Sequence, residues 1–303
     1  MKKVLWTVIA LVLAPISALA LGMSSTNYLI EWDSINAGGD DVSSSTNFQI
    51  RDTLGQFVSG DGQSTNFQLR AGYRVGETQE PFLSIDNGTQ ENSTETTWTS
   101  FSSSTNQVDV GNPTVFTVDN YIGLVENKGF GQFLVFGKIT GIAGSTITVD
   151  KWDGDTNLLS GSPAGGNDFA YKANGNVAAL GVQAPGQEST SFTLTSIATN
   201  AQNGYTVTVG TDGDLRSGSS TIRNVADGTV TAGNEEYGGE VVGSSATGTG
   251  MDFALTTSTR DIQLGSAHAS DERTGLIYKL SIDVSTPTGN FSHNVQYRLT
   301  ANF

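Results

Sequence analysis

The chain has 303 residues, a formal net charge of −15 and no cysteine. This acidic balance disfavours nucleic acid as a partner, because contacts with phosphate need clustered Lys and Arg. The absence of cysteine excludes disulfide bonds, thiol nucleophiles and cysteine-ligated zinc or iron–sulfur centres. Hydrophobic residues make up 36% of the sequence, which is enough to bury a core and predicts a folded protein.

The first twenty residues predict a secretory signal peptide. Lys2 and Lys3 precede an apolar run at 4–13, and Ala18 and Ala20 give the small-x-small pattern at which signal peptidase cuts. The apolar run is too short to span a bilayer stably, and no stop-transfer segment follows it. We therefore expect an exported protein that is either secreted or located at the cell surface.

Three copies of a Ser-Thr-Asn-aromatic-x-aliphatic repeat follow, at residues 25–30, 45–50 and 64–69. In an extended strand, the aromatic residue and the aliphatic residue two positions later lie on the same side. One unit is too small to cover its own apolar face, so residues 21–75 are predicted to form one small repeat sheet. The aromatic row of this sheet would consist of Tyr28, Phe48 and Phe67. We also expect the repeats either to dock onto the C-terminal domain or to pair with the same region of a neighbouring molecule.

Residues 76–105 are polar, with an Asn-Gly dipeptide and many Asn, Ser, Thr and Glu residues, and are predicted to be a linker. Residues 106–303 contain short segments rich in β-branched and aromatic residues, separated by turn dipeptides such as Asn203-Gly204. No window after the signal peptide sustains a helical period. The predicted fold is therefore all-β, with the repeat sheet followed by an Ig-like Greek-key β-sandwich with Gly-rich loops. The predicted strands are 115–118, 133–136, 145–149, 191–195, 205–209 and 277–284.

Parts of the chain resemble known bacterial proteins. The Ser-Thr-Asn-aromatic repeats, with the closing segment 69–73, resemble the N-terminal repeats of uncharacterised secreted proteins from candidate-phyla (Patescibacteria) bacteria. Segments 192–209 and 282–297 resemble hairpins of Ig-like bacterial surface domains, including WxL-like ones. The Trp-x-Leu motif of true WxL proteins is missing, so the resemblance does not imply attachment to peptidoglycan by that route. It implies a secreted or surface β protein with no assigned chemistry.

The sequence does not indicate an enzyme. There are two histidines, His268 and His293, which are predicted to be solvated, and a Gly-x-Ser-x-Gly elbow is missing. Neighbouring acids could serve glycoside hydrolysis only if two of them faced each other across a cleft. These acids are the pairs Glu31/Asp33, Glu235/Glu236 and Asp271/Glu272.

One segment is a candidate calcium site. Asp150, Asp153, Asp155 and Asn157 place three carboxylates and an amide oxygen around Gly154, and calcium prefers such oxygen ligands. The spacing is not that of an EF-hand and the closing Glu is missing, so an ordinary acidic β-turn is the competing interpretation. No other cofactor is indicated.

Three classes of function remain open. The favoured one is a non-enzymatic secreted or cell-surface structural or adhesive protein, with other surface proteins, glycans or further copies of itself as partners. The alternative is an extracellular carbohydrate-binding module in which Trp32, Trp98 or Trp152 stacks on sugar rings, unless these are core aromatics. The third is an outer-membrane β-barrel, because residues 295–303 alternate and end on an aromatic, although the other predicted strands are too short and irregular for it.

Overall fold

The computed structural model describes residues 81–163 and 165–303, together with the backbone pairing of six short strands between residues 23 and 71. The chain divides into two units, residues 1–80 and 81–303, which are taken in turn. No helix in the described ranges is long and apolar enough to cross a membrane.

The six strands of the first unit form three antiparallel hairpins, so the prediction of one repeat sheet is wrong for strand pairing. The strands of each hairpin flank one Ser-Thr-Asn-aromatic segment, and a connection this short favours pairing with the adjacent strand. The aromatic row of Tyr28, Phe48 and Phe67 lies outside the described residues and stays a prediction. The pairs are β1 (Met23–Ser24) with β2 (Leu29–Ile30), β3 (Ser43–Ser44) with β4 (Gln49–Ile50), and β5 (Gly60–Gln63) with β6 (Gln68–Ala71).

The second unit contains a β-sandwich of two antiparallel sheets. One layer has the order β7-β15-β21-β19 and the other has the order β20-β16-β22. Val207, Ile262 and Leu276 are fully or almost fully buried in the core cluster that the two layers share. The first layer consists of β7 (Leu83–Gln90), β15 (Ser189–Thr199), β21 (Ala269–Ser281) and β19 (Glu236–Val242), and the second of β20 (Arg260–Gly265), β16 (Tyr205–Thr211) and β22 (Val295–Ala301).

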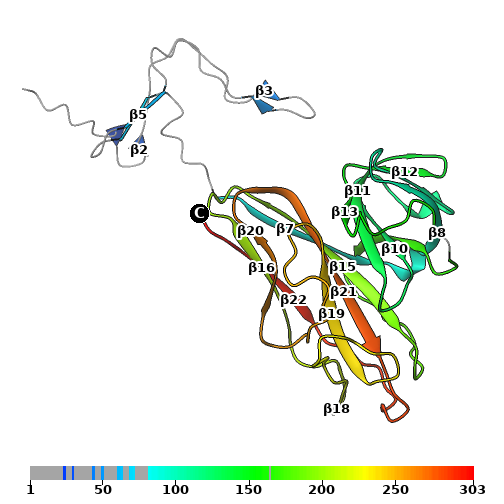
Figure 1. The fold of residues 1–303 in the computed structure, drawn as a ribbon. Coiled ribbons are helices and arrows are strands. Elements are labelled where there is room, and N and C mark those ends of the chain that lie inside the picture. The colour runs from blue at the N-terminus through cyan, green and yellow to red at the C-terminus, as the bar shows by residue number, and fades with distance from the viewer. Residues whose placement is uncertain are drawn as a thin grey trace, which may run out of the picture. The chain divides into compact units, whose positions relative to one another are not determined.

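A closed ring of six strands is inserted in the chain between β7 and β15, and it lies beside the sandwich (Figure 1). Its order is β10-β11-β12-β9-β8-β14, and the pairing of β14 with β10 closes it. Trp98, Ile122 and Ile147 are buried in its core. The ring consists of β8 (Thr96–Ser102), β9 (Gln107–Val110), β10 (Tyr121–Glu126), β11 (Phe133–Ala143), β12 (Thr146–Val149) and β14 (Phe169–Gly175), and the short β13 (Asp153–Gly154) pairs with β11.

A third apolar cluster joins the ring to the sandwich. Side chains alternate across a strand, so Leu124 of β10 belongs to the ring core while its neighbour Val125 belongs to the shared cluster. Phe192 of β15 and Ile277 of β21 are the sandwich side of this cluster. The ring and the sandwich therefore pack against each other through this third cluster, which is distinct from the core of either.

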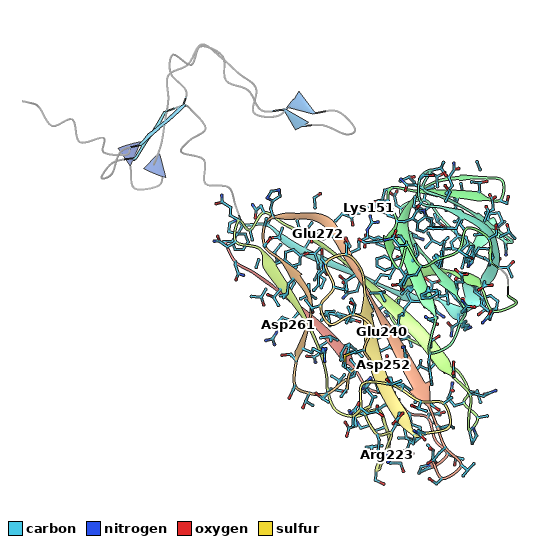
Figure 2. The ribbon with its side chains drawn as sticks, viewed as in Figure 1. Lys151, Arg223, Glu240, Asp252, Asp261 and Glu272 are labelled. Atoms are coloured by element: carbon cyan, nitrogen blue, oxygen red, sulfur yellow. The ribbon has the colours of Figure 1, made fainter. Side chains whose placement is uncertain are left out.

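Strand β21 also carries a buried lysine, Lys279, on the face opposite Tyr278 and Leu280. The Nζ of Lys279 lies 2.7 Å from Glu240 Oε2 and 2.8 Å from Asp252 Oδ1, and Figure 2 shows these two acids close together on the sandwich. A buried ammonium group is tolerated only when it is paired in this way.

Two short strands, β17 (Arg216–Ser217) and β18 (Ser220–Thr221), form a separate hairpin.

The all-β prediction is confirmed, but the predicted linker at 76–105 is wrong. It contains β7, which pairs with β15 of the sandwich and with β14 of the ring, and it contains β8 of the ring. The inner positions of β7 carry polar side chains such as Thr89, whose hydroxyl bonds Thr193 at 3.0 Å, so the segment lacked an apolar signal. The predicted strand 115–118 is also wrong, because the 3₁₀ helix Pro113–Val115 occupies its start. The Asn112 side chain caps this helix by accepting a hydrogen bond from the Thr114 backbone N–H. The other predicted strands overlap observed ones.

Candidate functional site

A cavity of about 640 Å³ opens between the two layers of the sandwich. Its walls come from β7, β15, β19 and β21 of one layer and from β22 and the segment before it in the other, and residues 175–181 close one side. This volume lies within the range of pockets that hold small ligands, about 300–1,000 Å³.

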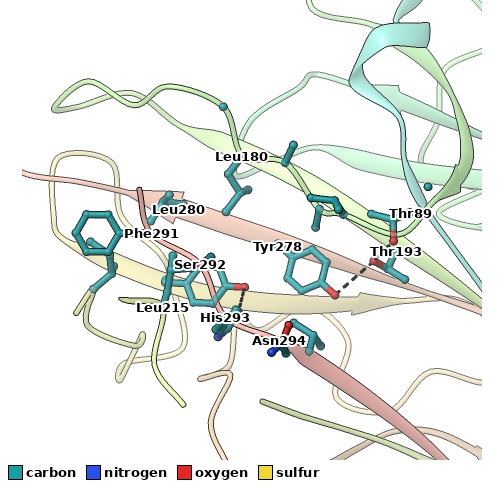
Figure 3. A pocket seen from close by; sticks show the side chains of 18 of the residues that line it. Thr89, Leu180, Thr193, Leu215, Tyr278, Leu280, Phe291, Ser292, His293 and Asn294 are labelled. Atoms are coloured by element: carbon teal, nitrogen blue, oxygen red, sulfur yellow. Dashed lines mark hydrogen bonds between the residues drawn. The ribbon is translucent and has the colours of Figure 1, made fainter. Parts of the chain in front are cut away.

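The cavity has an apolar end and a hydroxyl-bearing end. Figure 3 shows Leu215, Leu280 and Phe291 at one end and Thr89, Thr193 and Asn294 at the other, with Tyr278 reaching toward Thr193. The alternation along β21 carries both kinds of side chain into the cavity, because Tyr278 and Leu280 are two residues apart and face the same side.

Four hydroxyl groups form a connected row at the polar end. The Thr89 and Thr193 hydroxyls lie 3.0 Å apart, the Thr193 hydroxyl donates to the Tyr278 hydroxyl at 3.4 Å, and the Tyr278 and Tyr297 hydroxyls lie 2.7 Å apart. Each hydroxyl carries one hydrogen. The three bonds of the row use three of the four hydrogens, so one hydrogen remains for a ligand.

The tyrosines of the cavity stay uncharged. Burial raises the pKa of Tyr278 and raises the pKa values of Tyr237 and Tyr297 well above the ordinary value for a phenol. All three therefore keep their proton at neutral and moderately alkaline pH. None of them is then present as a phenolate that could act as a base.

His293 is held on both ring nitrogens, so the prediction that it is solvated is wrong. Its Nδ1 lies 3.1 Å from the Gly213 carbonyl oxygen and its Nε2 lies 3.0 Å from the Tyr237 hydroxyl. A carbonyl can only accept, so Nδ1 carries a hydrogen and donates it to Gly213. The Tyr237 ring also packs edge-on against the imidazole, at 5.2 Å between centroids. His268, in contrast, is exposed as predicted.

The cavity lining contains few ionisable side chains besides this histidine and the tyrosines. None of the described residues that line it is Asp, Glu, Lys or Arg. Gln183 lines it as well; its Nε2 donates to the Leu180 carbonyl at 2.5 Å, while its Oε1 is buried without a hydrogen-bond partner in the described part of the chain. A buried acceptor without a partner is costly, so a ligand hydroxyl that reached it would gain a hydrogen bond.

The structure does not bring the predicted calcium ligands together around one point. Asp150 pairs with Arg273, Asp153 accepts from the backbone N–H of Ser244 at 3.1 Å, and Asp155 accepts from that of Leu134 at 2.9 Å. Asn157 is exposed. Among residues 81–163 and 165–303, no group of three metal-ligating side chains is present. Calcium binding at this segment thus stays a prediction that the side-chain arrangement does not favour.

The described acids that the sequence suggested for glycoside hydrolysis also bond to separate structural partners. Glu235 pairs with Arg223, and Glu272 accepts from Tyr205 and Ser245, so each described acid has its own structural partner. The pair Glu31/Asp33 and Trp32 lie outside the described residues. The remaining described candidates are Glu236, which accepts from the Thr231 backbone, and Asp271, which accepts from Arg273 and Ser196.

The two described tryptophans belong to the ring and do not line the cavity. Trp98 is 1% exposed, and its Nε1 donates to the Val125 carbonyl at 3.2 Å, so it is a core aromatic. Trp152 is half-buried and packs edge-on against Phe101, at 5.3 Å between centroids. Stacking of a sugar on Trp98 is therefore excluded by its burial.

Sequence reasoning missed the cavity because its residues come from strands and connecting segments that are far apart in the sequence. One signal was present: Val295, Tyr297 and Leu299 alternate along β22, the strand that suggested the outer-membrane alternative. In the structure these side chains pack against the core of the sandwich.

In comparisons with protein-family models, with curated proteins and with solved structures, no match to this chain was found.

Proposed function

We propose that this chain is a non-enzymatic secreted or cell-surface protein, structural or adhesive in role, that uses the sandwich cavity to bind its partner without changing it chemically. One observation carries the proposal: none of the described lining residues is Asp, Glu, Lys or Arg, and the hydroxyls of the cavity are bonded to one another. General acid–base catalysis needs a side chain that can take up or release a proton at the working pH. Burial raises the pKa values of the tyrosines, and both ring nitrogens of His293 are engaged in hydrogen bonds within the protein.

Export supports the same proposal. The predicted signal peptide at 1–20 directs the chain out of the cytoplasm, and an acidic chain rich in Gly, Ser and Thr is typical of an exposed surface protein. Partners would be other surface proteins, glycans or further copies of the chain, and not nucleic acid.

Fractionation of the source cells tests the location. We expect the protein in the medium, or on intact cells where added protease removes it. Recovery in the cytoplasm would contradict the proposal, and so would turnover of a bound ligand.

A carbohydrate-binding module is the second candidate, and the row of hydroxyls favours it, since hydroxyl groups and aromatic rings are the usual contacts of a sugar. A glycan array separates the two. A hit that Tyr297→Phe weakens and Trp152→Phe leaves unchanged would place the sugar in the cavity. A hit with the opposite pattern would place it on Trp152, and no hit would leave the structural or adhesive role.

A further inference from the structure

We propose that the sandwich cavity binds a neutral amphipathic small molecule, with its apolar part against Leu280 and Phe291 and a hydroxyl-bearing head at Tyr278 and Tyr297. This inference rests on the proposed function, because it names the class of ligand that a binding site of this composition takes.

The neutrality of the ligand follows from the lining. A charged group that enters the cavity loses its water, and the described lining offers it no Asp, Glu, Lys or Arg as a partner. Both ring nitrogens of His293, which also lines the cavity, are already hydrogen-bonded to Tyr237 and Gly213. Burial of an unpaired charge is strongly unfavourable. The phenols of Tyr237 and Tyr297 also stay neutral, since burial raises their pKa values well above the ordinary value.

The two ends of the cavity differ in polarity, which is why we expect an amphipathic ligand. Leu280 is 7% exposed and belongs to the apolar core cluster, and Phe291 packs against the same cluster. An alkyl or similar apolar group would extend this contact, at roughly 25 cal/mol for each Å² that it removes from water. Such a group gains nothing at the other end, where the hydroxyl row lies.

The head group follows from the hydrogen bonds that the protein leaves open. The row of four hydroxyls has one hydrogen more than its three internal bonds use, and that hydrogen can be donated to a ligand oxygen. Gln183 Oε1 lies away from this row, because the Gln183 side chain bonds the Leu180 carbonyl, which also accepts from Ser189, the cross-strand partner of Leu280. A neutral oxygen that accepts the spare hydrogen of the row, such as the hydroxyl of an alcohol or a sugar, is therefore the head group that fits it.

The experiment uses three probes on the full chain. Octyl glucoside, below its micelle concentration, carries a neutral hydroxyl head and an alkyl tail; octanoate carries a charged head on a comparable tail; glucose has the head alone. Calorimetric titration should show octyl glucoside binding at least about tenfold more tightly than either of the others. Equal affinity for octanoate and octyl glucoside, or no binding of octyl glucoside, would overturn the inference.

Two matched variants locate the site. Ala178 lines the cavity, and Ala184 lies on the same connecting segment, is exposed and does not line it. Ala178→Trp should fill the cavity and weaken octyl glucoside at least about tenfold, whereas Ala184→Trp should not change its affinity. Equal effects of the two variants would contradict the assignment. Thermal unfolding of both variants shows whether the fold is intact.

A third variant tests the head group. Tyr297→Phe removes the terminal hydroxyl of the row and keeps the ring, so it should lower the preference for octyl glucoside over octanoate several-fold. An unchanged preference would show that the row does not contact the head. Release of free glucose from the probe would instead contradict the non-enzymatic function and leave the ligand class standing, so the two proposals fail in different ways.

Discussion

Arg273 of the sandwich and Asp150 of the inserted ring form an ion pair across the junction between them. Arg273 Nη1 donates to Asp150 Oδ1 at 3.0 Å, and Arg273 Nε donates to Asp271 Oδ1 at 2.9 Å. The guanidinium also lies over the Tyr121 ring of β10, at 5.2 Å from its centroid. Because the Arg273 side chain is only 1% exposed, its charge depends on these partners.

Replacement of this arginine should destabilise the protein substantially. Arg273→Ala removes the cation that Asp150 and Asp271 share. It leaves two like charges beside the space that the arginine side chain had filled. We expect the free energy of unfolding to fall by about 3 kcal/mol, measured by urea denaturation. Arg298→Ala, at an exposed position of β22, is the control and should change it by no more than about 0.5 kcal/mol. Equal effects of the two substitutions would show that the buried pair is not needed.

The same ion pair should make stability depend on acid pH. Burial alone would raise the pKa of Asp150, but hydrogen bonds from Arg273 and from the backbone of Lys151 and Lys138 hold it below its ordinary value. A carboxylate with a lowered folded-state pKa stabilises the fold above its unfolded pKa, about 3.9, and this contribution is lost as the pH falls through the folded pKa. Between pH 5 and pH 2.5, the wild-type protein should therefore lose more stability than Asp150→Asn. Parallel curves from urea denaturation across this range would refute the assignment.

Local sequence patterns predicted part of the fold. The segments 191–195 and 205–209, which are rich in β-branched and aromatic residues, lie within β15 and β16. Segment 205–209 is buried on one face, whereas every residue of 191–195 is buried. Strand β7 was missed because its buried positions include Thr89 and Gln90, which are polar and bonded within the structure. Composition alone does not distinguish such a strand from a linker.

Contacts between distant segments were not predictable in this way. The closed ring depends on the pairing of β10 with β14, which no local pattern encodes. The carboxylate of Asp150 looked available for calcium because its partner, Arg273, is far away in the sequence. The cavity could not be predicted for the same reason, since Tyr297 meets Thr89 and Thr193 only after the two layers have packed.

The contact of ring and sandwich gives a third prediction. A Cβ atom added at Gly123 of β10 would lie 2.3 Å from Cζ of Phe192, which is fully buried. Gly123→Ala should therefore overpack the junction and cost about 1–3 kcal/mol in urea denaturation. Gly131→Ala, where the added atom has no neighbour within 4 Å, should be tolerated. Combining Gly123→Ala with Phe192→Leu should restore part of the loss, and no recovery would argue against this contact as the cause.

The two tryptophans of the ring should respond differently to the same substitution. Trp98→Phe leaves a space in the ring core and removes the hydrogen bond to the Val125 carbonyl, so we expect a loss of about 2 kcal/mol. Trp152→Phe removes an indole N–H that is buried without a partner in the described part of the chain, and a phenyl ring keeps much of the packing on Phe101. Its free energy of unfolding should stay within about 0.5 kcal/mol of the wild-type value, because the lost N–H made no bond. Urea denaturation of both variants, followed by circular dichroism so that the readout does not depend on tryptophan, measures the difference. A larger loss for Trp152→Phe than for Trp98→Phe would mean that the ring core is organised around Trp152 instead.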